Sequence, residues 1–311
     1  MSKALIEYYN GKEKSVEDIY KNKAQILLEA LPYIKEYFNR IVVVKLGGTI
    51  MDDDKSLMKV LDDLILMKYV GINVIVIHGG GKQITKLMEE KNIKVEFCDG
   101  MRVTNEEAIK TVKMVLLGEI NSKIVSFLNR HGKLAVGLSG NDANFVNCKK
   151  KMYEKDGKKI DLGYVGEIIE INKDFLLNIL NNGYLPVIAT LGSDSKGNVY
   201  NINADTFACG IASKFEAKKM ILLTDVDGIK VMENTGERLV SKISVSGCSK
   251  LIETKEISKG MVPKVNACID ALKNGVERAH LLNGNSEHSI LIEIFTDKGI
   301  GTMVVKDSNN Y

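Results

Sequence analysis

The feature that most constrains the fold of this chain is an alternation of short runs of branched aliphatic residues with longer amphipathic segments. The runs include IVVV at 41–44, VIVI at 74–77 and MILLTDV at 220–226, and helical periodicity follows the first two at 56–71 and 82–92. Strands that alternate with helices are joined by crossovers, and uninterrupted Val, Ile and Leu runs are typical of strands buried on both faces. The sequence therefore predicts an α/β fold with an open, mainly parallel sheet and helices on both of its faces.

The same alternation continues along the rest of the chain, with one interruption. We expect further helices over 105–131, 175–183, from Ala204 onward and 263–274, and further strands over 133–139, 184–189, 279–283 and 301–305. Segment 148–170 breaks the rhythm, because its residues alternate around a DG turn, and it predicts a β-hairpin.

A helix is also expected before the first strand, over residues 15–38. Its apolar residues recur on one face, SVED at 15–18 has the form of a capping box, and Pro32 predicts a kink near 30–32. The domain that follows looks complete without this helix. Its apolar stripe therefore packs either on its own domain or on a second subunit, and the sequence leaves both interpretations open.

Charge and hydropathy exclude several classes of partner. The 43 basic and 40 acidic residues give a formal charge of +3 and are spread along the 311 residues, so nothing favours binding to nucleic acid or to an anionic membrane. No run approaches the ~20 apolar residues of a membrane span, and the first residues lack the apolar stretch of a signal peptide. We therefore expect a cytoplasmic protein.

Cysteine and histidine side chains give no sign of a metal site. The five cysteines are widely spaced and include no C-x-x-C pair, so reduced thiols are expected. The four histidines form no set at metal-ligand spacing, and we expect structural roles for them, with His78 the least certain because it precedes three glycines. No protein-bound metal is predicted.

Two glycine-rich turns follow predicted strands: KLGG at 45–48 and HGGG at 78–81. Neither matches the G-x-x-x-x-G-K-[ST] phosphate loop or the G-x-G-x-x-G dinucleotide loop. Both fall at the carboxyl ends of strands, where open parallel sheets bind ligands, and their backbone N–H groups suit phosphoryl or carboxylate oxygens. Tight turns needed only for steric reasons remain the alternative.

Charged residues elsewhere supply candidate partners for an anion. Asp205 opens a helix in NINADT, where a capping role is the alternative. Lys264 follows Pro263 in a first helical turn, against the preference of the helix dipole. Arg102 can hold a carboxylate with two hydrogen bonds or simply face solvent. Together with Lys45 and the glycine-rich turns, and without a catalytic triad, these residues favour phosphoryl transfer.

The order of these motifs resembles that of the amino acid kinase family. The resemblance runs from about residue 40 to residue 305 through KLGG, HGGG, DGMRVT, GLSGND, DLGYVGE, LPVIA, NINADT, LLTDVDG, GMVPK and EIFTDKGIGT. Some of these motifs are shared with carbamate, aspartate, glutamate and uridylate kinases, whereas DGMRVT, DLGYVGE and NINADT resemble the acetylglutamate branch. The resemblance implies a three-layer αβα sandwich with a helical extension at 1–39, an amino-acid-binding lobe at 40–212 and an ATP-binding lobe at 213–311.

The resemblance also implies a reaction and its residues. The γ-carboxylate of N-acetyl-L-glutamate would receive a phosphoryl group from ATP, with Mg2+ held through the nucleotide phosphates, in the second step of arginine biosynthesis. A carboxylate is already ionised at neutral pH, so this reaction needs no general base. The implied catalytic residues are Lys45, Lys264 and Asp205; the substrate residues are Gly80, Gly81, Arg102 and Asn201; the nucleotide residues are Gly47, Gly48, Thr224 and Asp225.

The N-terminal helix and EIFTDKGIGT resemble an arginine-inhibited, hexameric branch of the family. L-Arginine would contact Tyr33, Glu293, Gly299 and Gly301, although Glu293 could also be a solvated residue at the end of a strand. Two other readings of the whole chain stay open: a family member that acts on glutamate, aspartate or carbamate, and a non-catalytic arginine-sensing scaffold. Thr49, Lys82 and Asn141 depart from the residues common in the family.

Overall fold

The computed structural model describes residues 16–155, 157–233, 236–258, 260–297 and 299–307. Its centre is an eight-stranded sheet, and every neighbouring pair of strands is parallel except β15 with β16. In spatial order the strands are β14 (Lys242–Ser244), β16 (Thr302–Val305), β15 (Arg278–Asn283), β11 (Lys219–Thr224), β1 (Ile41–Leu46), β2 (Asn73–His78), β8 (Leu185–Ala189) and β5 (Ala135–Ser139). The predicted open and mainly parallel sheet is confirmed.

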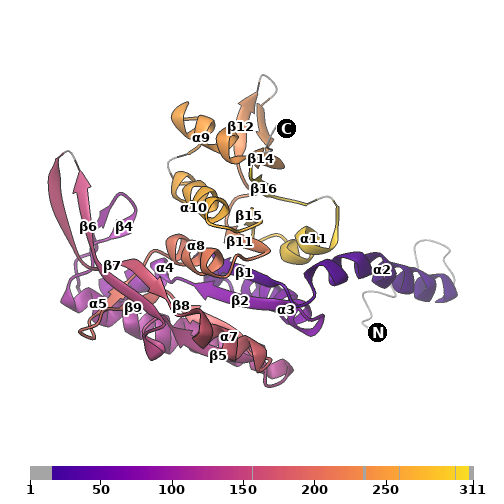
Figure 1. Cartoon of the computed structure of the whole chain (residues 1–311), viewed down its shortest axis with the longest axis horizontal. Helices are drawn as coiled ribbons and strands as arrows, with labels where there is room; N and C mark the ends of the chain where they lie inside the picture. The colour runs from indigo at the N-terminus through magenta and orange to yellow at the C-terminus, as the bar shows by residue number, and fades with distance from the viewer. Residues whose placement is uncertain (1–15, 156, 234–235, 259, 298, 308–311) are drawn as a thin grey trace.

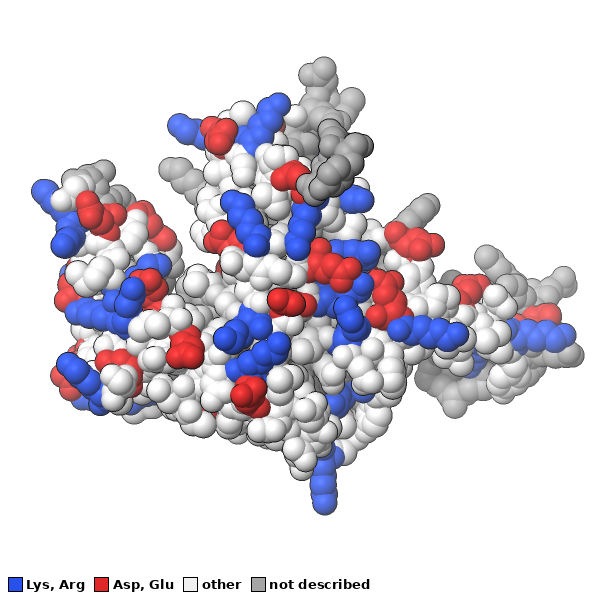
Figure 2. All heavy atoms as spheres, viewed as in Figure 1, with Lys and Arg blue, Asp and Glu red and all other residues white. Residues whose placement is uncertain are grey.

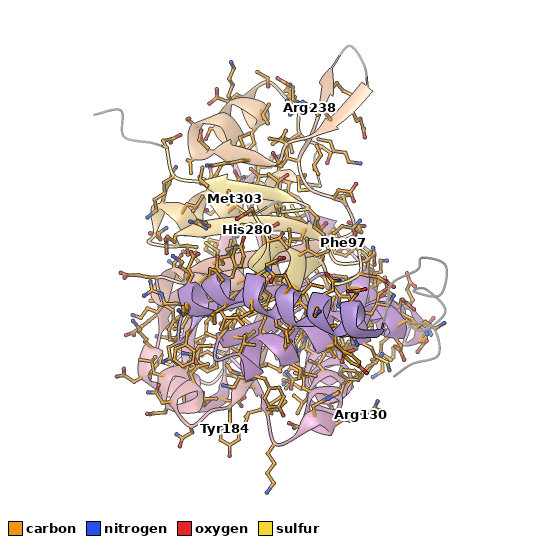
Figure 3. All side chains as sticks on the ribbon, turned by 90° about the vertical axis from the view of Figure 1, so that its right-hand side faces the viewer. Phe97, Arg130, Tyr184, Arg238, His280 and Met303 are labelled. Atoms are coloured by element: carbon orange, nitrogen blue, oxygen red, sulfur yellow. The ribbon has the colours of Figure 1, made fainter. Side chains whose placement is uncertain are left out.

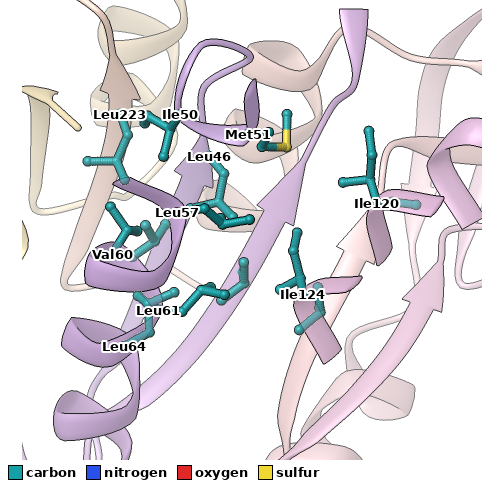
Figure 4. Close-up of a cluster of buried hydrophobic side chains, with 14 of the residues drawn as sticks. Leu46, Ile50, Met51, Leu57, Val60, Leu61, Leu64, Ile120, Ile124 and Leu223 are labelled. Atoms are coloured by element: carbon teal, nitrogen blue, oxygen red, sulfur yellow. The ribbon is translucent and has the colours of Figure 1, made fainter. Parts of the chain in front are cut away.

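Helices cover both faces of this sheet (Figure 1). One face carries α3 (Asp54–Tyr69), α4 (Gly81–Glu90), α5 (Glu106–Lys113), α6 (Ser122–Leu128) and α11 (Ser289–Phe295), and the other carries α7 (Lys173–Asn181), α8 (Ala204–Lys214), α9 (Val245–Glu253) and α10 (Val262–Lys273). Along β1, Val42 and Val44 join the hydrophobic cluster of the first face and Val43 joins that of the second, because successive residues of a strand point to opposite faces. The structure is therefore the expected three-layer αβα sandwich, and Figure 4 shows part of the first cluster.

The helix expected over 105–131 changes its geometry midway. Residues Met114–Asn121, labelled η2, form a π-helix between α5 and α6, and a short 3-10 turn follows at Asn129–His131. π-Helical segments are rare and are frequently found at functional sites. Periodicity alone could not predict this segment, because one additional residue per turn barely changes the apolar pattern.

The predicted hairpin is present and longer than expected. It consists of β6 (Val146–Lys155) and β7 (Lys158–Ile171), and it projects from the body of the molecule in Figure 1. At its base it closes a small barrel with β9 (Leu191–Ser193) and β10 (Val199–Asn201).

Several short elements were not predicted from the sequence. They are β3 (Phe97–Cys98), β4 (Met101–Arg102), β12 (Lys230–Glu233), β13 (Gly236–Leu239), β9, β10, β14, α9 and α11. Most of these strands have two to four residues, which is too few for an alternation to be recognised.

The N-terminal helix α2 (Val16–Tyr37) projects from the sandwich (Figure 1). Its last turns pack on this chain, where Tyr37 is buried and Tyr33 lies against the first cluster. Among the described side chains of its earlier turns, the large apolar residues Tyr20, Ile26, Leu27, Leu28 and Leu31 are exposed, and Leu27 keeps 72% of its surface accessible. The helix is uninterrupted at Pro32, so the kink stays a prediction.

The surface charge, the cysteines and the hydropathy of the helices can be compared with what the sequence predicts. On the face in Figure 2, basic and acidic side chains are interspersed. All five cysteines are free thiols. None of the helices in the described ranges combines the length and apolar character that crossing a bilayer requires.

Candidate active site

A pocket of about 530 Å³ opens at the carboxyl ends of β1 and β2. Its walls come from the KLGG turn, the HGGG turn, the β3–β4 ribbon, the hairpin and the segment that joins β10 to α8. Both glycine-rich turns therefore meet at one edge of the sheet, as the strand order requires. The position of the pocket agrees with the predicted ligand site.

Three predicted catalytic residues meet in one ion-pair cluster beside this pocket. Lys45 Nζ lies 2.9 Å from Asp205 Oδ1, and Lys264 Nζ lies 3.2 Å from Asp205 Oδ2. Lys45 is the penultimate residue of β1, Asp205 lies in the first turn of α8 and Lys264 lies in the first turn of α10. The cluster carries a net charge of +1, so it can attract an anion at this edge of the sheet.

The capping interpretation of Asp205 is wrong. The N-cap of α8 is Asn203, whose Oδ1 accepts hydrogen bonds from the backbone N–H groups of Asp205 and Thr206 at 3.0 and 3.1 Å. The Asp205 side chain is therefore left to pair with the two lysines. Burial opposes ionisation of Asp205, but the charges of Lys45 and Lys264 outweigh it and hold the pKa of this carboxyl below its ordinary value.

In each glycine-rich turn, one glycine is tightly packed and the next has open space where a Cβ would lie. A Cβ on Gly80 would lie 2.4 Å from Ile120 Cδ1, and a Cβ on Gly47 would lie 2.5 Å from the Leu223 carbonyl oxygen. Gly48 and Gly81 have open space at the same position. Gly80 caps α4 and Gly81 begins it, so their N–H groups belong to the unpaired end of a helix. In the described part of the chain, neither N–H has a hydrogen-bond acceptor.

Arg102 is buried, so the alternative that it faces solvent is wrong. Its Nη2 donates to the Gly81 carbonyl oxygen at 2.8 Å and to Thr85 Oγ1 at 2.7 Å, and Phe97 covers its guanidinium at 4.7 Å. Burial lowers the pKa of Arg102, yet a guanidinium keeps its charge in proteins. No acidic side chain pairs with it among the described residues. A buried, unpaired cation that lines the pocket is suited to a carboxylate ligand.

The other predicted residues lie at the same edge of the sheet. Asn201 lines the pocket from the end of β10. Thr224 ends β11, the strand beside β1, and its Oγ1 donates to Asp225 Oδ1 at 3.1 Å. Neither Thr224 nor Asp225 lines the pocket. Asn201 therefore belongs to the pocket, whereas Thr224 and Asp225 lie at the end of β11, outside the pocket lining.

Two lysines that line the pocket were not predicted from the sequence as ligand contacts, and of these Lys82 was identified only as a departure from the family pattern. Lys151 reaches the pocket from the hairpin, and a lysine within a KKK run gave no signal in the sequence. Lys82 also lines the pocket and forms an ion pair with Asp52 at 2.7 Å. Asn141 lies elsewhere and accepts a hydrogen bond from Ser139 Oγ at 2.8 Å.

Three of the residues assigned to an arginine site lie where α2 packs on α11, a region we call the cluster under α2: Tyr33 in α2, Glu293 in α11, and Gly299, which packs on Glu293. Tyr33 donates to Asp297 Oδ1 at 2.6 Å. Glu293 lies in α11 and is only 8% exposed, so its interpretation as a solvated residue at a strand end is wrong. Its Oε1 lies 2.8 Å from Nδ1 of His280, which Figure 3 labels on the strands behind α2.

Gly299 packs closely on Glu293, whereas Gly301 packs on the strand β15. A Cβ on Gly299 would lie 2.3 Å from Glu293 Oε2, and a Cβ on Gly301 would lie 2.2 Å from the Leu281 carbonyl oxygen. Burial opposes ionisation of Glu293, but His280 and Lys219 hold the pKa of this carboxyl below its ordinary value. Burial also lowers the pKa of Lys219 to about 8.

No group of three or more His, Cys, Asp or Glu side chains in the described ranges is arranged to hold a metal ion.

Comparison with known proteins agrees with this geometry. Residues 40–283 match the profile of the Amino acid kinase family. Proteins named acetylglutamate kinase from Caldicellulosiruptor saccharolyticus and Methanocaldococcus jannaschii are 44% and 46% identical, over 95% and 92% of this chain and 99% and 97% of theirs.

Solved structures show the same fold. An N-acetylglutamate synthase from Neisseria gonorrhoeae, complexed with coenzyme A and N-acetyl-glutamate, superposes with a TM-score of 0.81 at 26% identity, over 92% of this chain and 64% of that one. The structure of smu.665 from Streptococcus mutans superposes with a TM-score of 0.70 at 28% identity, over 86% and 99%. The family profile, the full-length relatives and the shared fold together establish that this chain is a kinase and belongs to the amino acid kinase family.

Proposed function

We propose that this kinase transfers the γ-phosphoryl group of ATP to the γ-carboxylate of N-acetyl-L-glutamate, the second step of arginine biosynthesis, in the cytoplasm. The observation that carries the proposal is the Lys45–Asp205–Lys264 cluster beside a pocket that contains the buried Arg102. The names of the relatives, which cover nearly their whole length, support the same substrate.

The two lysines neutralise the charge of the phosphoryl group in transit. Asp205 holds both ammonium groups at fixed positions, so they need no rearrangement when the transition state forms. The N–H groups of Gly80 and Gly81 donate to oxygens of the substrate or the phosphoryl group. The attacking carboxylate is already ionised, so binding and charge neutralisation do the work that a general base does elsewhere.

Arg102 and Asn201 bind the α-carboxylate of the amino acid and its surroundings. Burial gives an arginine–carboxylate hydrogen bond more energy than it has in water, which favours an anionic substrate in this part of the pocket. The nucleotide lies toward β11, where Gly47, Gly48, Thr224 and Asp225 line its site. Mg2+ bound through the nucleotide phosphates supplies further neutralisation of charge. We accordingly assign substrate binding to residues 40–212 and ATP binding to 213–311.

An assay of ADP release over a panel of acceptors tests this proposal. N-Acetyl-L-glutamate, L-glutamate, L-aspartate and carbamate are compared by kcat/KM, and the acetylated substrate is expected to be preferred. A higher kcat/KM for any other acceptor would assign the chain to a different kinase of the family. Lys264→Ala is expected to abolish turnover while ATP binding persists, which separates an enzyme from a non-catalytic arginine-sensing scaffold.

We further propose that L-arginine inhibits the enzyme from the cluster under α2 and that α2 joins dimers into a hexamer. The buried Glu293 supplies a carboxylate, Gly299 packs directly on it, and Tyr33 lies in α2, which packs on the helix α11 that carries Glu293. Gly301 packs on the neighbouring strand β15. The exposed apolar residues of α2 supply a surface for the same helix of a second copy. Deletion of residues 1–38 is expected to give a dimer with weakened arginine inhibition. A hexamer of the truncated protein by light scattering would refute the role of α2.

A further inference from the structure

The HGGG turn rests on a buried histidine for which the proposed reaction gives no role. His78 ends β2, and its side chain has no exposed surface. Its Nδ1 lies 3.1 Å from the Gly79 carbonyl oxygen, and its Nε2 lies 3.0 Å from Nδ2 of Asn121. Asn121 is itself buried and is the last residue of the π-helical segment η2.

The direction of both hydrogen bonds follows from the backbone around Asn121. Its amide also faces the Val187 carbonyl oxygen at 2.9 Å, and a carbonyl oxygen can only accept. The atom of Asn121 at this position is therefore the nitrogen, which donates to Val187 and to His78 Nε2. His78 Nε2 must then accept, so the ring proton lies on Nδ1 and is donated to the Gly79 carbonyl oxygen. Burial lowers the pKa of His78 to about 4, which agrees with a neutral ring.

The bond to Gly79 fixes the orientation of the next N–H group. In a trans peptide the C=O of one residue and the N–H of the next point in opposite directions. No cis peptide is present in the described ranges. The Gly79 carbonyl oxygen faces the buried His78, so the Gly80 N–H faces the opposite side, which is the pocket that Gly79 and Gly80 line.

The π-helical segment η2, which carries Asn121, also packs on the HGGG turn. Ile120, labelled in Figure 4, and Leu116 pack on Gly80, where a Cβ would lie 2.4 and 3.0 Å from their methyl groups. Asn121 occupies a space that exists because residue 137 is glycine, since a Cβ there would lie 2.1 Å from Asn121 Oδ1. The π-helical segment η2 therefore contacts the HGGG turn directly, through Leu116 and Ile120, and indirectly, through the hydrogen bond between Asn121 and His78.

We propose that Asn121 and His78 are positioning residues for the proposed phosphoryl transfer. Asn121 selects the Nδ1–H tautomer of His78, His78 holds the Gly79 carbonyl oxygen, and the Gly80 N–H is thereby aimed at the oxygen that gains charge in the transition state. Neither side chain contacts the substrate. The effect of these residues on the reaction rate rests on the proposed function. The hydrogen bonds among Asn121, His78 and Gly79 do not.

Two substitutions of His78 separate positioning from general packing. In His78→Asn the amide nitrogen takes the place of Nδ1 and can still donate to Gly79, whereas in His78→Gln the side-chain oxygen takes the place of Nε2 and leaves Gly79 without its donor. We expect His78→Gln to lower kcat by about 10- to 100-fold, less than complete loss of an oxyanion donor, with little change in KM for ATP. His78→Asn is expected to keep a kcat close to that of the wild type. Equal loss in both variants, or no loss in either, would overturn the proposal.

A measurement on the wild-type enzyme decides the arrangement even if a variant fails to fold. In protein labelled with 15N-histidine, the His78 signal is identified by its absence from His78→Asn or, failing that, by its resistance to titration. Its nitrogen shifts are expected to show a neutral ring with the proton on Nδ1. A proton on Nε2, or a charged ring at pH 7, would overturn the proposal. Absence of turnover of N-acetyl-L-glutamate by the wild type would instead refute the proposed function.

Discussion

Replacement of Asp205 by asparagine removes the one negative charge of the Lys45–Asp205–Lys264 cluster and keeps the shape of the side chain. At an effective dielectric constant of about 20, the contacts of 2.9 and 3.2 Å correspond to Coulomb energies of about 6 and about 5 kcal/mol. Desolvation of the three groups cancels much of this, and loss of one partner from a buried pair costs about 3–5 kcal/mol. The Lys264 side chain is 23% exposed and can turn to solvent, so we expect the lower end of this range.

A loss of about 3 kcal/mol corresponds to a decrease in Tm of about 5 °C for a chain of this length. The same substitution is expected to lower kcat by about 100-fold or more, because two lysines that repel each other no longer hold the transferring group in place. Calorimetry and an ADP-release assay measure the two effects. Asp174→Asn is the matched control, because Asp174 is an exposed residue in the first turn of another helix.

The pH dependence of stability provides a second readout for Asp205→Asn. The folded-state pKa of Asp205 is below its ordinary value. The contribution of ionised Asp205 to the free energy of unfolding is therefore fully present above the unfolded pKa of about 3.9. It is lost as the pH falls through the folded pKa. The stability curves of the wild type and the variant should converge as the pH is lowered. Parallel curves, or a kcat of the variant near that of the wild type, would refute this account of the cluster.

Further substitutions test three other parts of the structure. Arg102→Lys should raise KM for the amino acid by about 10- to 100-fold and change kcat less, because a charge-assisted hydrogen bond contributes about 1.5–3 kcal/mol; an unchanged KM would exclude Arg102 as the carboxylate ligand. Gly80→Ala should lower the free energy of unfolding by about 1–3 kcal/mol, because its Cβ meets Ile120 Cδ1 at 2.4 Å, and Ile120→Val should restore part of it in a urea titration. Burial lowers the pKa of His280, so wild-type stability should fall as the pH decreases below about 6.5, and His280→Gln should weaken that dependence; identical pH profiles would contradict it.

The layers of the fold could be predicted because the sequence patterns of their strands and helices extend over many residues. The run at β1 and the helical periodicity of α3 each extend over enough residues to fix an element, and the alternation of the two requires parallel crossovers. The ion-pair cluster could be predicted as a set of residues, since each member lies in a motif at the start of a helix or the end of a strand. Its distances could not, because they depend on the packing of α8 against α10.

The environment of individual side chains was less accessible to sequence analysis. Arg102 is buried because the two-residue strands β3 and β4 place it against α4 and Phe97, and such short strands give no periodic signal. Glu293 is buried because α11 packs over β15, which brings it to His280. The link from Asn121 to His78 joins residues 43 positions apart through a π-helix, a geometry that sequence periodicity does not encode.

Chemical trapping of the product tests whether the enzyme phosphorylates the γ-carboxylate of N-acetyl-L-glutamate. Hydroxylamine converts an acyl phosphate to a hydroxamate, so the enzyme is incubated with ATP, Mg2+ and N-acetyl-L-glutamate in its presence and the products are identified by mass spectrometry. We expect the γ-hydroxamate of N-acetyl-L-glutamate in equal amount to the ADP released, and neither product with Lys264→Ala. Release of ADP without hydroxamate, or hydroxamate formed faster from unacetylated glutamate, would contradict this expectation.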